Sequence, residues 1–254
     1  MALEYPPNEL DCRNKNEELL EEWKNFLLGK KTFEKKDAYN EFVNDGGFYP
    51  YYSSQKSKIL YVGWESRGLA GENYLKILHG EYKRNHIDTT HINSHPLHRL
   101  LFRMTYGIQN NSEWDDIPKA SDLTKDFATA QGISFAFMNF SKFSNETNSR
   151  ALRRKLVNDF IKLSKNESKN YWNEQIRILD PHIIITMNLR KYWDLNLLGE
   201  IKPIDAKNHY YTLKAGNRDI KLIDAMYHFS SSVSPKTVFY EPITNILRGN
   251  SQNK

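Results

Sequence analysis

The stretch Lys58-Ile59-Leu60-Tyr61-Val62-Gly63-Trp64-Glu65-Ser66-Arg67-Gly68 decides the fold. A run of apolar and β-branched residues ends at Gly63, and the carboxylate of Glu65 follows two residues later. Such a run predicts a buried strand. In open α/β sheets, ligands bind just outside the carboxyl ends of the strands. We therefore expect Glu65 to stand at a functional edge of the sheet, beside Arg67.

Three later apolar runs predict further strands, and helical patterns separate them. The strands are expected at 133–140, 182–187 and 219–227, with a local hairpin that pairs 210–213 with 219–224. The spacing of apolar residues predicts helices at 16–28, 38–43, 96–107, 149–164, 169–179 and 235–248. Strands that alternate with helices favour a parallel sheet covered on both faces. The predicted fold is α/β, with three α/β/α layers around a mostly parallel four-stranded sheet.

The chain is expected to form two parts. Residues 1–50 are predicted to be a helical N-terminal extension, and residues 51–254 an α/β domain. The sequence shows no internal repeat, low-complexity tract or Gly/Ser-rich linker. A length of 254 residues is enough to bury a sizeable core.

Composition narrows the class of protein. No apolar run approaches the roughly 20 residues that cross a bilayer, and residues 1–22 lack the apolar core of a secretory signal. We therefore expect a cytoplasmic (intracellular) monomer with no membrane partner. The single cysteine, Cys12, excludes an internal disulfide and any four-cysteine metal or iron–sulfur site. The net charge of +5 is compatible with a polyanionic partner without establishing one.

Polar residues follow the ends of the four predicted strands. Because the carboxyl ends of parallel strands share one edge, we expect a set of side chains to converge there: Glu65, Asn139, Lys142, Asn188 and His228. Taken singly, each has a structural alternative. Glu65 could be a solvated acid in a loop. Asn139 could cap the junction of its strand and the following loop, and His228 could be a structural histidine. Their joint placement is what indicates a site.

Three short motifs at these strand ends resemble those of the uracil-DNA glycosylase superfamily. Gly63-Trp64-Glu65 is similar to the family's first motif, a strand followed by Gly-x-Asp/Asn. The stretch 137–142 is similar to the strand that ends in a base-reading asparagine, and His228-Phe229-Ser230-Ser231 to a late His-Pro-Ser motif. The resemblance spans about 58–248. Ser66 and Phe229 stand where the family commonly has proline, and the single cysteine excludes its iron–sulfur branches.

The resemblance implies a DNA glycosylase, an N-glycosyl hydrolase of DNA repair that needs no cofactor and no metal. Its substrate would be a damaged or deaminated base flipped out of DNA. Glu65 would orient water and stabilise the positive charge that develops on the sugar. His228 would hydrogen-bond to the departing base. Asn139 would read the base edge, with Gly63 and Trp64 beside it.

Several side chains are candidates for binding the DNA backbone. Arg67, Lys142, Ser230 and Ser231 are expected near the base site. A basic helix start adds three arginines, Arg150, Arg153 and Arg154, whose structural alternative is a solvated helix face. Val233 is the candidate to fill the gap that a flipped base leaves.

A histidine cluster is expected to be structural. It comprises His86, His91, His95 and His98. Pro96 interrupts a single helix through these positions, which removes the spacing that would turn the imidazoles toward one metal ion.

Two other functions stay open from the sequence. The chain could be a catalytically inactive module of the same fold that binds a modified base or other nucleic acid. It could also be an α/β hydrolase-type enzyme for a small substrate, although no phosphate-binding glycine loop and no Gly-x-Ser-x-Gly turn is present.

Overall fold

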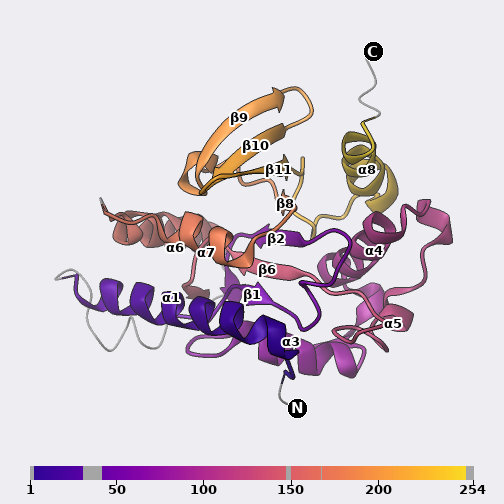
Figure 1. Cartoon of the computed structure of the whole chain (residues 1–254), viewed down its shortest axis with the longest axis horizontal. Coiled ribbons are helices and arrows are strands. Elements are labelled where there is room, and N and C mark those ends of the chain that lie inside the picture. The colour runs from indigo at the N-terminus through magenta and orange to yellow at the C-terminus, as the bar shows by residue number, and fades with distance from the viewer. Residues whose placement is uncertain (1–2, 31–41, 147–149, 167, 250–254) are drawn as a thin grey trace.

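A seven-stranded sheet forms the centre of the protein (Figure 1). The computed structural model describes residues 3–30, 42–146, 150–166 and 168–249. Across the sheet the strands are β1 (Gly47–Phe48), β6 (Ala136–Asn139), β2 (Ile59–Gly63), β8 (Ile183–Thr186), β11 (Arg218–Asp224), β10 (Tyr210–Ala215) and β9 (Glu200–Asp205). The four central strands, from β6 to β11, are parallel, and β1, β10 and β9 are antiparallel to their neighbours.

The four predicted strands are the parallel part of this sheet, and the α/β class is confirmed. The hairpin of β10 with β11 is also present. The sheet is larger than the four strands expected, because three antiparallel strands extend its edges. Strand β1 has only two residues. Strand β9 is largely exposed and contains Pro203, which an edge strand tolerates because one side of it makes no ladder hydrogen bonds.

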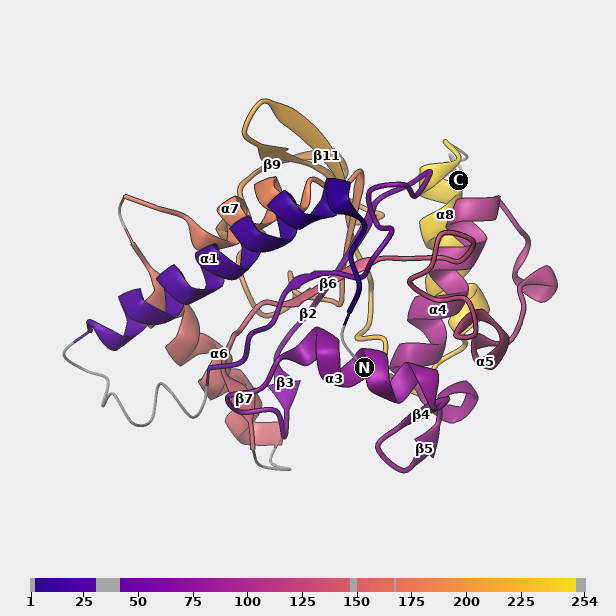
Figure 2. The same ribbon diagram turned by 60° about the horizontal axis from the view of Figure 1, so that its bottom comes forward.

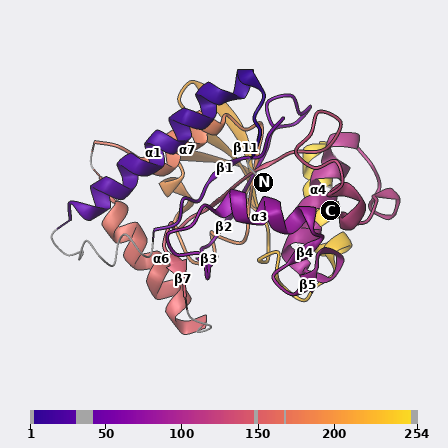
Figure 3. The same cartoon turned by 90° about the horizontal axis from the view of Figure 1, so that it is seen from below.

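Helices pack on both faces of the sheet (Figures 2 and 3). Alternate residues of β2 point to opposite faces: Tyr61 packs with one core cluster, and Leu60 and Val62 with another. The first cluster holds α3 (Tyr74–Lys83), α4 (Pro96–Asn110), α5 (Ala120–Leu123) and α8 (Glu241–Leu247). The second holds α1 (Leu10–Leu28), α6 (Arg150–Ser164) and α7 (Tyr171–Leu179).

Most predicted helices are present, and the structure differs from the prediction in the following elements. Helix α3 was not predicted, because Gly80 interrupts its run of helix-forming residues; Asn73 caps its start by accepting from the Lys76 N–H. The predicted helix at 38–43 lies mostly outside the described residues, and its described end is not helical, because Phe42 forms an antiparallel bridge with Phe143. The last predicted helix is a π-helical turn (Lys236–Tyr240) followed by α8.

Short elements complete the described structure. The 3₁₀ turns are Pro7–Glu9, Ile92–Ser94, Trp114–Asp116 and Leu195–Leu197. Two small sheets pair β3 (Ser66–Arg67) with β7 (Ser144–Asn145), and β4 (His86–Ile87) with β5 (Thr90–His91). Among the described residues, no helix is both long and apolar enough to cross a membrane.

The N-terminal segment packs into the same core as the rest of the chain. Trp23 of α1 is fully buried, stacks on Tyr171 and meets Trp172 edge to face. Its indole N–H donates to Ser164 Oγ at 3.0 Å. Strand β1 joins the central sheet beside β6. Residues on the two sides of the predicted boundary at residue 50 therefore share one core.

Candidate functional site

A cleft of about 860 Å³ opens at the carboxyl ends of the parallel strands. It is lined by polar side chains that follow four different strands, namely Glu65, Asn139, Asn188 and His228. Its other wall comes from the segment before α4 and the first turn of that helix, including His95 and His98. The parallel register of β6, β2, β8 and β11 explains this convergence, because it places all four strand ends at one edge.

Glu65 is fixed in the cleft by the loop after β2. Its side chain is fully buried, and Oε1 lies 3.6 Å from Nε of the half-exposed Arg67. The neighbouring Trp64 donates its indole N–H to the Met187 carbonyl at 2.7 Å. The backbone ladder also continues past β2, since the Phe140 and Ser141 N–H groups donate to the carbonyls of residues 63 and 64. The carboxylate thus stands on a rigid base.

His228 lies in the loop after β11 and meets Trp64 edge to face, with ring centroids 5.3 Å apart. The Ser230 backbone N–H donates to His228 Nδ1 at 3.2 Å, and Ser230 Oγ lies 2.7 Å from the same nitrogen. A ring nitrogen that accepts a backbone N–H carries no proton, so the neutral ring holds its proton on Nε2. Phe229, which stands where the resembled family has proline, is buried against Phe239 and anchors the loop.

Asn139 forms the floor of the cleft and is held from below by Asp45. The Asn139 backbone N–H donates to Asp45 Oδ1 at 2.6 Å, and its side-chain Nδ2 donates to Asp45 Oδ2. Gly63 lies directly opposite Asn139 in the sheet. A Cβ at Gly63 would overlap Asn139 Oδ1. Glycine is therefore required at residue 63 for the amide to lie as it does.

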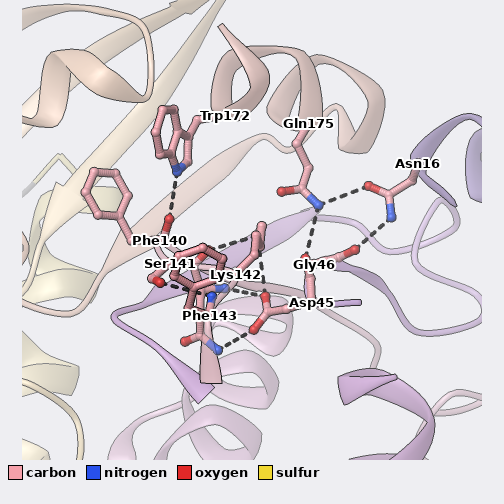
Figure 4. A network of polar contacts seen from close by, with 10 residues as sticks. Asn16, Asp45, Gly46, Phe140, Ser141, Lys142, Phe143, Trp172 and Gln175 are labelled. Atoms are coloured by element: carbon pink, nitrogen blue, oxygen red, sulfur yellow. Dashed lines mark hydrogen bonds and ion pairs between the residues drawn. The ribbon is translucent and has the colours of Figure 1, made fainter. Parts of the chain in front are cut away.

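Lys142 is fully buried, and its side chain points to Asp45 (Figure 4). Its ammonium donates to the Asn139 carbonyl at 2.9 Å and lies 3.5 Å from Asp45 Oδ1. Burial lowers the pKa of Lys142 to about 8, although Asp45 opposes the shift. Burial likewise raises the pKa of Asp45, and Lys142 opposes that rise. This placement corrects the prediction that Lys142 contacts DNA, because its side chain does not reach the surface.

Cations and aromatic rings occupy the exposed part of the cleft. Arg154 and Lys191 both lie near the Tyr192 ring, with Cζ of Arg154 5.5 Å and Nζ of Lys191 5.4 Å from its centroid. Tyr192 and Tyr227 are exposed, at 36% and 44%. Both line the cleft, as do Ser230 and Ser231. Exposed rings beside cations suit unpaired bases and phosphates.

Three residues that were predicted to contact DNA are not placed in the cleft by the structure. Arg150 and Arg153 belong to the first turns of α6, and their side chains are outside the described residues. Val233 is half-buried and packs against the core. Met226, 63% exposed and next to the cleft residue Tyr227, is the more accessible apolar side chain.

The four clustered histidines form two separate pairs. His86 meets His91 in the β4–β5 hairpin, and His95 meets His98 at the start of α4. Helix α4 begins at Pro96, as the sequence indicates, and His95 caps it. His98 Nδ1 lies 2.8 Å from the Tyr82 hydroxyl, and burial lowers the pKa of His98 well below its usual value. Within the described residues, no three His, Cys, Asp or Glu side chains are placed to hold a metal ion.

Sequence reasoning missed several residues of this site. Tyr192 and Lys191 follow β8, so the strand-end argument could have found them. Asp45 gives no such signal, because it precedes the strands and lies in an irregular segment. Protein-family models give no match to the chain, and curated protein sequences show no significant similarity to it. The site must therefore be interpreted from its own chemistry.

Proposed function

We propose that the protein is a DNA glycosylase-like enzyme with a uracil-DNA glycosylase-like fold, and that it hydrolyses the N-glycosidic bond of an unpaired or flipped base. One observation carries the proposal. A carboxylate, a carboxamide and an imidazole from three different strand ends, those of Glu65, Asn139 and His228, line one cleft that also carries exposed cations.

The three groups match the charges of the reaction. As the bond breaks, positive charge develops on the sugar and negative charge on the leaving base. The Glu65 carboxylate would stabilise the sugar cation and orient the water that adds to the anomeric carbon. The Nε2–H of neutral His228 would donate to the departing base, which takes the electron pair of the broken bond. Asn139 would contact the edge of the base.

The environment of the cleft supports a nucleic-acid substrate over a small metabolite. Arg67, Arg154 and Lys191 supply positive charge for phosphates. Tyr192 and Tyr227 offer exposed rings on which bases can stack. A closed apolar pocket, typical of an α/β hydrolase for a small substrate, is not what lies around Glu65.

A second candidate is a binding module without catalysis. The observation in its favour is the burial of the Glu65 side chain, whose Oε1 already faces Arg67. A carboxylate so enclosed must gain access to water before it can assist hydrolysis. Such a module would bind an unpaired base and leave the glycosidic bond intact.

The test uses single-stranded and duplex oligonucleotides that contain uracil, hypoxanthine, xanthine, a thymine mismatch, or an unpaired adenine or cytosine. Alkali converts any abasic site to a strand break. We expect base release from at least one substrate, and a loss of about 10²-fold or more in Glu65→Gln and in His228→Gln. Glu72→Gln, at an exposed residue that does not line the cleft, should keep full activity.

The outcomes separate the candidates. Folded protein that releases no base from any substrate overturns the enzyme. Salt-dependent binding without release then supports the binding module. Failure to bind any oligonucleotide rejects both.

A further inference from the structure

We infer that Asp45 is a positioning residue that turns the Asn139 amide so that only its oxygen faces the cleft, and that the cleft therefore selects a base whose edge carries an exocyclic amine. This inference rests on the proposed function, and it deepens that function by naming the class of base. It also gives residues 1–50 a role in the site, since Asp45 lies outside the segment with family resemblance.

The orientation of the amide follows from the chemistry of its partners. An ionised carboxylate only accepts hydrogen bonds. Asp45 Oδ1 already accepts from the Asn139 backbone N–H, and Oδ2 faces the Asn139 side chain. The reversed amide would bring two oxygens together without a hydrogen between them. Nδ2 must therefore point to Asp45.

The remaining groups leave the oxygen as the contact for a ligand. Tyr74, stacked on Phe137, lies beside the Asn139 side chain, whose polar interaction opposes the rise of the Tyr74 pKa by burial. Among the described residues, Asn139 Oδ1 makes no hydrogen bond, and it lies over Gly63, a residue of the cleft. The floor of the cleft thus presents an acceptor.

The Asp45 carboxylate and the backbone turn that carries it are both held by buried groups (Figure 4). Lys142 supplies the compensating positive charge. The turn at Asp45–Gly46 is fixed by Gln175 of α7, whose Nε2 approaches the Asp45 carbonyl, and by Asn16 of α1, whose Nδ2 donates to the Gly46 carbonyl at 2.7 Å. Gly46 has a φ of +105°, and a Cβ there would overlap Gln175. The arrangement holds Asp45 rigidly under Asn139.

An acceptor on the floor discriminates between base edges. An exocyclic amine, as in adenine or cytosine, donates to Asn139 Oδ1. A base without that amine leaves the oxygen buried and without a hydrogen bond, which weakens binding. The two matched comparisons are adenine against purine, and cytosine against pyrimidin-2-one, because the members of each pair differ only in the amine.

The test measures binding by fluorescence anisotropy in the Glu65→Gln background, so that no base is released. The probes are short single strands of abasic residues with one central base from the matched pairs. We expect the amine-bearing base to bind about five- to tenfold more tightly. Equal binding within both pairs overturns the inference while leaving the proposed function intact. No binding to any probe overturns both.

Two variants test the role of Asp45. The double variant Asp45→Asn/Lys142→Met removes both buried charges together, which avoids leaving one uncompensated, and frees the amide to turn. Its preference within each pair should fall below about twofold. If that variant does not fold, Gly63→Ala displaces the Asn139 oxygen from the other side and should also reduce the preference. Gly80→Ala, where a Cβ meets nothing within 4 Å, should retain it. A full preference in the folded variants overturns the inference.

Discussion

Burial of His79 is expected to contribute to the acid sensitivity of the protein. His79 of α3 is 8% exposed, and within the described residues its Nδ1 has no hydrogen-bond partner. Burial, with a contribution from nearby Lys83, lowers its pKa to about 4. The unfolded chain keeps the ordinary value of about 6.5. Between these two values the unfolded state binds more protons, so stability falls as the pH falls from about 6.5 to about 4.

Replacing His79 should remove this part of the pH dependence. In His79→Phe, the loss of unfolding free energy between about pH 7 and pH 4.5 should be smaller than in the wild type by about 1 kcal/mol. Urea denaturation at the two pH values measures it. His86→Gln, at an exposed histidine of the β4–β5 hairpin, should leave the dependence unchanged. Identical pH dependences in His79→Phe and the wild type would show that His79 is not the group responsible.

At the scale of elements, one carboxylate organises the loop that follows β8. Asp224, at the end of β11, accepts from the Thr186 hydroxyl at 2.5 Å and from the backbone N–H groups of Leu189 and Arg190 at 2.8 and 3.1 Å. It is 2% exposed. Burial raises its pKa, and these hydrogen bonds oppose the rise. The same loop carries the cleft residues Asn188, Lys191 and Tyr192.

Asp224→Ala should therefore destabilise the protein and weaken its binding to nucleic acid together. Three donors lose their acceptor, and the expected cost is about 3 kcal/mol in unfolding free energy. The released loop should also reduce affinity for single-stranded DNA several-fold. Denaturation and anisotropy titrations measure the two effects. Asp219→Ala, at an exposed position of the same strand, should change stability by less than about 0.5 kcal/mol. Normal affinity in a folded Asp224→Ala would mean that the loop does not contact DNA.

The elements differ in how far they could be predicted from the sequence. The four parallel strands were predictable because buried parallel strands are continuous apolar runs. Helices α1, α4 and α7 were predictable from their apolar spacing and their stops. Strands β1 and β9 were not, since one is two residues long and the other is exposed at the sheet edge. These edge strands form because they pair with the existing sheet, and their own sequences carry little strand pattern.

The candidate site was predictable only in part, because some of its residues contact one another although they are far apart in the sequence. Glu65, Asn139 and His228 follow apolar strands, so parallel pairing alone predicts that they share an edge. Asp45 contacts Asn139 across 94 residues of sequence, and no local pattern encodes that contact. Lys142 was expected at the surface because a lysine that follows a strand is usually exposed. It is buried instead, beside the buried carboxylate of Asp45. The roles of all these residues stay predictions.

At the scale of the whole molecule, charge should govern how the cleft meets DNA. The net charge of +5 is modest, and the cleft concentrates Arg154 and Lys191 beside Tyr192. Each cation that neutralises a phosphate of single-stranded DNA releases a counterion, which contributes about −0.7 to the slope of log affinity against log salt concentration. The two contacts beside Tyr192 are therefore expected to contribute about −1.4 to the slope.

Lys191→Gln should make that slope shallower by about 0.7, because one phosphate contact is lost. The measurement is a set of anisotropy titrations of single-stranded DNA over a range of salt concentrations. Lys202→Gln removes the same charge from β9, where Lys202 is exposed and lies 3.4 Å from Glu200, outside the cleft. Both variants change the net charge equally, so a general electrostatic effect would alter both slopes alike. A change confined to Lys191→Gln assigns the phosphate contact to the cleft; equal changes would mean that DNA is bound by diffuse charge and not at this site.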